Sequence, residues 1–157
     1  MIMKESSNIP KVIGFYGYSN SGKTSLICRL IKAIEKAGLS TAVIKRTDKS
    51  ISSESAEKDT TGFRAAGAKM TSFSSASETN FVLPSSMPLS LIIAKIRALM
   101  EVDIIIVEGA RDPEIRKVRL GDIPERDNTI YTYEGDFDNL MELISKLPTR
   151  RCDNDED

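Results

Sequence analysis

The chain has 157 residues, of which 40% are hydrophobic and 29% charged. This length predicts one domain, and the composition excludes fibrous, collagen-like and wholly disordered classes. The net charge of −1 argues against a nucleic-acid binder held by phosphate attraction. Histidine is absent, which excludes Ser-His and Cys-His nucleophiles and every His-ligated metal site.

Cysteine content and hydropathy predict the compartment. The two cysteines, Cys28 and Cys152, give no disulfide framework, so a reducing environment is expected. Residues 1–10 lack the apolar stretch of a signal peptide, and the longest aliphatic run, Ile104–Val107, is too short to cross a bilayer. We therefore expect a cytoplasmic protein that binds neither membrane nor nucleic acid.

The first third of the chain has the order strand, helix, strand. Lys11–Gly17 is apolar and β-prone, which predicts a strand buried on both faces. Gly22–Ala37 has apolar residues at helical spacing, and Gly38 is suited to end that helix. Ser40–Arg46 reads as a second strand, so a right-handed crossover and a parallel sheet are expected.

The middle of the chain is harder to interpret. Thr47–Thr61 is polar and aperiodic, which is typical of a functional or mobile loop. A short helical turn is expected over residues 60–67. Met70–Ser74 and Thr79–Leu83 then suggest two short strands that form a hairpin across Ser75–Ser77.

The last third returns to regular elements. Ser90–Met100 shows helical spacing, and Val102–Val107 is the clearest buried strand of the sequence. Arg116–Leu120 and Thr129–Tyr133 predict further strands, and Asp136 is a fair N-cap for a final helix. No repeat or linker interrupts the pattern, so we expect one domain over residues 1–148 and a frayed acidic tail over residues 149–157.

One motif at the end of the first strand carries chemistry. The segment Gly17–Thr24 (GYSNSGKT) fits the P-loop pattern G-x-x-x-x-G-K-[ST]. Its two glycines, Gly17 and Gly22, permit the backbone angles that turn N–H groups inward at a helix N-terminus, where they favour an anion. Lys23 can then reach the β- and γ-phosphates, and the Thr24 hydroxyl can ligate Mg²⁺.

A second element supports the first. The strand Val102–Val107 is followed by Glu108 and Gly109, so a carboxylate stands at the ligand-bearing edge of the expected parallel sheet. In P-loop proteins such a carboxylate supports Mg²⁺ or orients the attacking water. Asp103 lies at the opposite end of the same strand, too far away to share the site. The fold class predicted is α/β: a P-loop NTPase three-layer sandwich with a mostly parallel sheet, to which the antiparallel hairpin could add at one edge.

Together these segments resemble the MobB family, the GTP-binding accessory proteins of molybdopterin guanine dinucleotide synthesis. The likeness runs from about residue 11 to residue 120, and the combination of KDT, AGA and VEG segments with the P-loop makes it specific. The stretches that carry it are Gly17–Leu26, Val43–Lys45, Lys58–Thr60, Ala66–Ala68, Val107–Gly109, Arg111 and Lys117–Val118.

The resemblance implies GTP and Mg²⁺ as ligands, a homodimer and at most a weak Mg²⁺-dependent GTPase. It also implies partnership with a MobA-like nucleotidyltransferase, which joins GMP to molybdopterin, and with molybdenum-insertion proteins. Lys23 and Glu108 would be the catalytic residues, and Thr24 and Glu108 would serve the metal. The implied nucleotide-binding positions are Gly17, Asn20, Ser21, Gly22, Lys23, Thr24 and Ser25, with Lys45, Asp59 and Thr60 near the γ-phosphate.

The sequence departs from the family after the second strand. Members often carry a K-H-x-x-H pattern there, whereas this chain reads Lys45-Arg46-Thr47-Asp48-Lys49. Any role that needs a neutral imidazole is therefore lost. Arg46 and Lys49 could still offer positive charge to phosphate, and Asp48 could support Mg²⁺.

Three functions compete at this point. A GTP-binding accessory protein is expected to turn over slowly, because no water-orienting Gln or arginine finger is evident. A small-molecule kinase would transfer the γ-phosphate of ATP or GTP from the same loop. A nickel- or cobalt-delivering GTPase would need His or Cys ligands, which are nearly absent, because the sequence has no histidine and two cysteines. The guanine base rests on the resemblance alone, and we expect it near Thr129–Tyr133.

Overall fold

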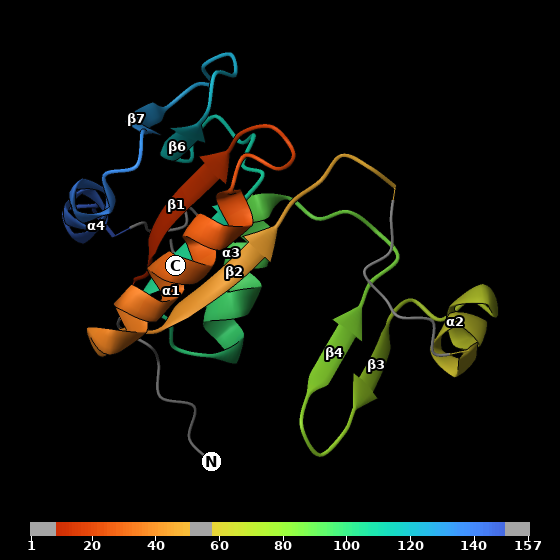
Figure 1. Ribbon diagram of the computed structural model, residues 1–157. Coiled ribbons are helices and arrows are strands. Elements are labelled where there is room, and N and C mark those ends of the chain that lie inside the picture. Colours follow the sequence, from red (N-terminus) through yellow and green to blue (C-terminus); the bar gives the residue numbers. More distant parts are fainter. Residues whose placement is uncertain (1–8, 51–57, 150–157) are drawn as a thin grey trace, which may run out of the picture. The chain divides into compact units, whose positions relative to one another are not determined.

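The computed structural model describes residues 9–50 and 58–149 of the chain (Figure 1). The chain divides into two compact units: unit 1 comprises the residues up to Thr47 and from Leu89 onward, and unit 2 comprises Asp48–Pro88. Unit 2 is thus inserted into unit 1, a division that the sequence pattern does not mark. The predicted acidic tail lies outside the described residues apart from Thr149.

Unit 1 is built on a five-stranded sheet with the order β2-β5-β1-β6-β7, in which every neighbouring pair is parallel. The predicted α/β class with a mostly parallel sheet is therefore confirmed. The observed elements differ from the predicted ranges by one or two residues at most ends, where helices and strands fray. Unit 1 contains β1 (Lys11–Tyr16), α1 (Lys23–Lys36), β2 (Thr41–Lys45), α3 (Leu89–Leu99), β5 (Ile104–Glu108), β6 (Lys117–Leu120), β7 (Thr129–Tyr133) and α4 (Phe137–Ser145).

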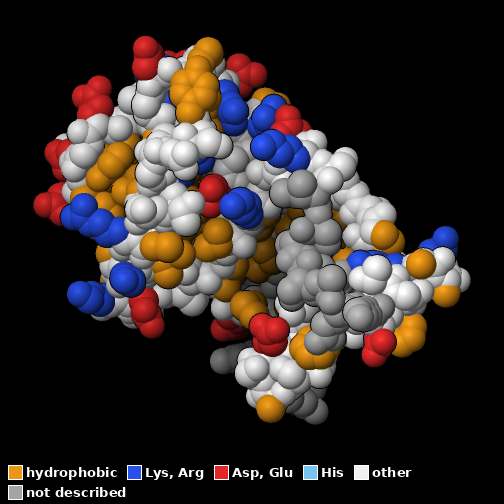
Figure 2. Space-filling model, turned by 45° about the vertical axis from the view of Figure 1, so that its right-hand side comes forward, with side chains coloured by type: hydrophobic (Ala, Val, Ile, Leu, Met, Phe, Trp, Pro, Cys, Tyr) orange, Lys and Arg blue, Asp and Glu red, His pale blue; other side chains and the backbone are white. Residues whose placement is uncertain are grey.

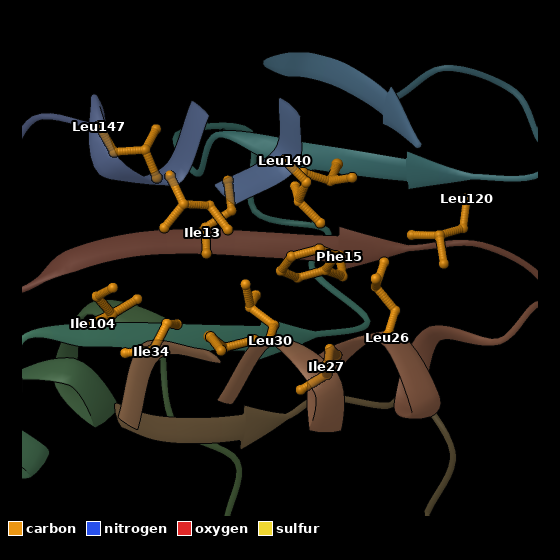
Figure 3. Close-up of a cluster of buried hydrophobic side chains, with 13 residues drawn as sticks. Ile13, Phe15, Leu26, Ile27, Leu30, Ile34, Ile104, Leu120, Leu140 and Leu147 are labelled. Carbon is orange, nitrogen blue, oxygen red and sulfur yellow. The ribbon is translucent and has the colours of Figure 1, made fainter. Parts of the chain in front are cut away.

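Helices cover both faces of this sheet and make three layers. On one face α1 and α4 bury a cluster that includes Ile13, Phe15 and Leu30, drawn in Figure 3. On the other face Ile93 of α3 and Ile105 of β5 belong to a second core cluster. Alternate residues of β1 and β5 therefore serve opposite cores, as the near-continuous apolar runs of these two strands predicted.

The ends of two elements are fixed by acidic side chains. Asp136 caps α4, since its carboxylate accepts a hydrogen bond of 3.0 Å from the backbone N–H of Asn139, as predicted. Asp103 precedes β5 and accepts 2.8 Å hydrogen bonds from the backbone N–H and the hydroxyl of Ser40, just before β2. Asp103 thus joins the amino ends of two strands, which agrees with a structural role away from the predicted site.

Unit 2 holds one helix and one hairpin. The helix α2 (Lys58–Ala65) begins earlier than the predicted turn over residues 60–67, so the polar segment Thr47–Thr61 is not wholly a loop. The predicted hairpin is present: β3 (Thr71–Ser74) and β4 (Thr79–Val82) pair antiparallel. They form a two-stranded sheet of their own and do not extend the sheet of unit 1.

Hydropathy gives one further result for the described parts of the chain. None of their helices has both the length and the apolar character that crossing a membrane requires.

Candidate functional site

The loop Gly17–Thr24 leaves the carboxyl end of β1 and leads into α1. Its backbone adopts two left-handed positions, Asn20 with φ 61° and Gly22 with φ 83°, and Gly22 is the residue that precedes the helix. Gly17 needs its lack of a side chain for another reason: a Cβ there would lie 2.5 Å from the carbonyl oxygen of Leu120. The loop thus bends tightly against β6 and turns into the helix, as the predicted P-loop requires.

The ammonium group of Lys23 lies across this loop. Its Nζ donates a hydrogen bond of 2.9 Å to the carbonyl oxygen of Gly17 and others to the Tyr18 carbonyl and the Ser21 hydroxyl. Loop carbonyls therefore hold the positive charge at the mouth of the loop.

A hydroxyl and a carboxylate from different elements meet where the loop enters α1. The Oγ1 of Thr24, in the first turn of α1, lies 3.4 Å from Oε1 of Glu108, the last residue of β5. This separation is long for a hydroxyl–carboxylate hydrogen bond. It is close to the roughly 3 Å that separates two neighbouring oxygen ligands of an octahedral Mg²⁺, each about 2.1 Å from the metal. The two residues predicted to serve the metal are therefore adjacent.

Backbone contacts fix the position of Glu108. The N–H of Gly109 donates to the carbonyl oxygen of Phe15 (2.8 Å), and the N–H of Arg46 donates to the carbonyl oxygen of Glu108 (2.8 Å). Gly109 has φ 80°, and a Cβ there would lie 2.4 Å from the carbonyl oxygen of Arg46. The carboxyl ends of β1, β5 and β2 are thus joined around the carboxylate, and a glycine is required after it.

Basic residues follow β2 at this edge. Lys45 is the exposed last residue of β2 and is in register with Glu108. The guanidinium of Arg46 lies 3.9 Å from the carboxylate of Asp112, and about a third of each side chain is exposed. The Arg residue that stands where the family often has histidine is therefore in an ion pair at the sheet edge, an arrangement the sequence did not indicate.

Other predicted residues lie in unit 2. Asp59 is exposed and Thr60 is buried on α2, while Asp48 and Lys49 precede the part of unit 2 that is not described. The structure brings together Lys23, Thr24 and Glu108 within unit 1. The roles of Asp59 and Thr60 near the γ-phosphate, of Lys49 toward phosphate and of Asp48 toward Mg²⁺ stay predictions.

A pocket of about 320 Å³ adjoins the loop. It lies on the side of β1 where β6 and β7 are found, away from β2. Sequence reasoning expected a base near Thr129–Tyr133, and Tyr133 does line this pocket, but most of its other walls were not foreseen. Arg29 lies one helical turn beyond Ser25 on α1, and the sequence alone does not indicate that it lines a pocket. The pocket is lined by Ser21, Gly22, Ser25, Leu26, Arg29, Leu120, Gly121 and Tyr133.

The described residues contain no group of three or more His, Cys, Asp or Glu placed to hold a metal ion. A magnesium ion held largely by phosphate oxygens and water needs only one or two protein ligands, and Thr24 and Glu108 fit that donor set.

A parallel sheet covered on both faces, with a glycine-containing loop opening α1 and a carboxylate at the neighbouring strand end, defines an α/β protein of three layers. The family model described as "Molybdopterin guanine dinucleotide synthesis protein B" matches residues 12–145. The chain therefore belongs to the MobB family, which takes part in molybdopterin guanine dinucleotide synthesis.

Individual relatives agree with this assignment. The chain is 34% identical over 102 residues to a molybdopterin-guanine dinucleotide biosynthesis adapter protein of Methanocaldococcus jannaschii, an alignment that covers 65% of this chain and 42% of that protein. This chain thus spans less than half the length of that relative.

Solved structures show the same fold. The crystal structure of Bacillus subtilis MobB superposes with a TM-score of 0.69 at 18% identity, covering 89% of this chain and 99% of that one. A second crystal structure, of molybdopterin-guanine biosynthesis protein B, gives a TM-score of 0.59 at 20% identity and covers 86% of this chain and 99% of that one.

Proposed function

We propose that this chain binds GTP with Mg²⁺ at the loop Gly17–Thr24 and serves as an accessory protein in molybdopterin guanine dinucleotide synthesis. The observation that carries the proposal is the 3.4 Å approach of Thr24 Oγ1 to Glu108 Oε1, at the end of a loop whose carbonyl oxygens hold the Lys23 ammonium. This arrangement offers a magnesium site next to a positive charge and the amino end of a helix.

The chemistry available at this site is positioning and charge neutralisation. Backbone N–H groups of the loop would hold the phosphates, Lys23 would neutralise the β- and γ-phosphates, and Thr24 and Glu108 would hold the metal. Mg²⁺, when bound, draws charge from the transferring phosphoryl group. Glu108 would also orient a water molecule near the γ-phosphate, so slow hydrolysis is the expected activity.

A slow nucleotide cycle suits an adapter better than a metabolic enzyme. The bound γ-phosphate would order the segment after β2, or a homodimer, and release it after hydrolysis. The partners in this proposal are a MobA-like nucleotidyltransferase and molybdenum-insertion proteins, and the compartment is the cytoplasm. No observation favours the alternative of a small-molecule kinase, and the family assignment points away from it.

The test is a thermal-shift titration with GTP, ATP and their diphosphates, with and without Mg²⁺. We expect GTP with Mg²⁺ to give the largest rise in melting temperature, because a ligand that binds only the folded state stabilises it by mass action. Lys23→Ala should lower GTP affinity by about 100-fold, since charged hydrogen bonds to phosphate are lost.

A matched control is Lys32→Ala, which removes one exposed positive charge from the same helix away from the loop. Its GTP affinity should stay close to that of the wild-type protein. Wild-type affinity in the Lys23→Ala variant would overturn the proposal, and substrate-dependent formation of a phosphorylated small molecule would favour the kinase instead.

A further inference from the structure

We propose that the pocket beside the loop takes the guanine base of the nucleotide, and that Arg29 reads the base through its O6 and N7 atoms. The inference rests on the proposed function and deepens it, because the loop contacts only phosphate and cannot distinguish one base from another. Guanine preference has so far followed only from the resemblance to a family.

The pocket is continuous with the loop, because the two share residues. Ser21 and Gly22 belong to the loop and also line the pocket, and Ser25 lines it from the first turn of α1. A nucleotide whose phosphates lie on the loop amides therefore has open space on this side for its sugar and base. The pocket's volume of about 320 Å³ is at the lower end of the range of small-molecule sites, which suits a nucleoside.

The pocket also has an aromatic wall. Tyr133, the last residue of β7, is half-buried and forms one wall, and Gly121 follows β6 beside it. An aromatic ring offers a stacking surface to any base, because every base has a π-face. Tyr133 therefore supplies affinity without selection among bases.

The guanidinium group of Arg29 is held by a neighbouring aromatic ring. Its guanidinium carbon lies 3.9 Å from the centre of the Phe137 ring, at the start of α4. A guanidinium stacked on an aromatic ring keeps its N–H groups in its own plane, where they can still donate hydrogen bonds. In the part of the chain that the structure describes, Arg29 makes no hydrogen bond or ion pair with protein, so this ring holds a fork of donors at the pocket wall.

Guanine and adenine differ in the hydrogen-bonding groups that they would present to this guanidinium. Guanine presents two acceptors side by side, O6 and N7, and arginine donating to both is the most frequent specific contact to this base. Adenine places an N6 amino donor where guanine has O6, so the same guanidinium would face a donor. Arg29 should therefore favour guanine and should equally accept hypoxanthine, which keeps O6 and N7 and lacks only the 2-amino group.

The experiment measures the affinities of GTP, ITP and ATP, each with Mg²⁺, by competition against a ribose-labelled fluorescent GTP analogue. The wild-type chain should bind GTP and ITP alike and ATP at least tenfold more weakly. Arg29→Ala should reduce the GTP-to-ATP ratio by about tenfold or more by weakening GTP and ITP together. Arg29→Lys, which keeps the charge but loses the planar fork, should recover only part of that ratio.

Lys32→Ala is again the matched control, since it removes a positive charge three residues along α1 from Arg29 and does not line the pocket. It should keep the wild-type ratio, and the melting temperature of each variant without nucleotide reports folding. An unchanged GTP-to-ATP ratio in Arg29→Ala, or ITP binding as weakly as ATP, would overturn this inference and leave the proposed function intact. Absence of Lys23-dependent GTP binding in the wild-type chain would overturn both.

Discussion

The two units of this chain differ in how far their large apolar side chains are buried. Unit 1 buries apolar side chains on both faces of its sheet, and residues such as Ile13 and Ile106 have no exposed surface. Unit 2 is smaller, and several of its large apolar side chains are at the surface, among them Phe63 and Phe81; Figure 2 shows hydrophobic side chains reaching the surface of this unit.

The packed core of unit 1 accounts for the rigidity of the candidate site. Lys23, Thr24 and Glu108 are all attached to elements of unit 1 whose other faces are packed in a core. A carboxylate and a hydroxyl from separate elements can be held within 3.4 Å only if those elements do not slide past each other. Asp59 and Thr60 lie instead on the short helix α2 of unit 2, where Asp59 is exposed and Thr60 is buried.

The difference in packing between the two units is tested most directly by removing one large apolar side chain from each unit. Ile106→Ala in β5 deletes a side chain with 0% exposure and should lower the free energy of unfolding by about 2–5 kcal/mol, because it leaves a cavity in a packed core. Phe63→Ala in α2 deletes one with 60% exposure and should change the free energy by less than about 0.5 kcal/mol.

Both variants are measured by urea denaturation, and the unfolding slope should stay near the wild-type value if the denatured state is unchanged. A loss of several kcal/mol in Phe63→Ala would show that unit 2 is as tightly packed as unit 1 in solution. The comparison between the two units would then be wrong.

Sequence pattern predicts unit 1 far better than unit 2, and the same packing explains why. β1 and β5 read as continuous apolar runs because both of their faces are buried, and α1 shows a clear apolar stripe because one face covers the sheet. In unit 2 the helix α2 mixes exposed apolar and polar residues, so no period marks where it begins. The division into two units was not predicted, although the polar segment Thr47–Thr61 begins at its first boundary.

The candidate site divides in the same way. The loop and Glu108 could be predicted because glycines, lysine and a strand-end carboxylate form a local pattern with a known chemical reason. The contact of Arg46 with Asp112 and the pocket wall at Arg29 could not, because each depends on residues that only the folded chain brings together. Gly109 is an intermediate case. Its place in the VEG segment can be read from the sequence, but its close approach to the carbonyl oxygen of Arg46 is visible only in the structure.

A second comparison concerns chemistry. Glu108→Gln keeps the size of the side chain but weakens a ligand to Mg²⁺, so GTP hydrolysis should slow by about 10- to 100-fold, with a smaller loss of GTP affinity. Asp59→Asn in unit 2 should change hydrolysis by only a few-fold and should leave GDP affinity unchanged, because its expected place is near the γ-phosphate alone. Single-turnover hydrolysis over a range of Mg²⁺ concentrations measures both.

If the two substitutions slow hydrolysis equally, the chemistry does not reside mainly in unit 1. Thr24→Val is a useful companion, since it removes the hydroxyl that lies beside Glu108 while keeping the shape of the side chain. It should also raise the Mg²⁺ concentration needed for half-maximal activity.

The smallest expected effect concerns Lys117, a lysine buried in β6 with no exposed surface. Its ammonium donates hydrogen bonds to the carbonyl oxygens of Ile115 (2.8 Å) and Asp127 (2.7 Å). Burial lowers the pKa of Lys117, and the carboxylates of Asp127 and Asp112 oppose that change only in part.

The lowered pKa fixes the sign of a pH effect on stability. Between the lowered pKa and the ordinary value of 10.5, the unfolded chain holds a proton that the folded chain has released. The contribution of Lys117 to the free energy of unfolding should therefore rise with pH across that window, by at most about 1.4 kcal/mol per pH unit, and stay constant below it. The measurement is the difference in unfolding free energy between the wild-type protein and Lys117→Met from pH 7 to 10.5, with Lys69→Met, an exposed lysine of unit 2, as the control. A difference that falls with pH, or the same trend in the control, would contradict burial of this lysine as the cause.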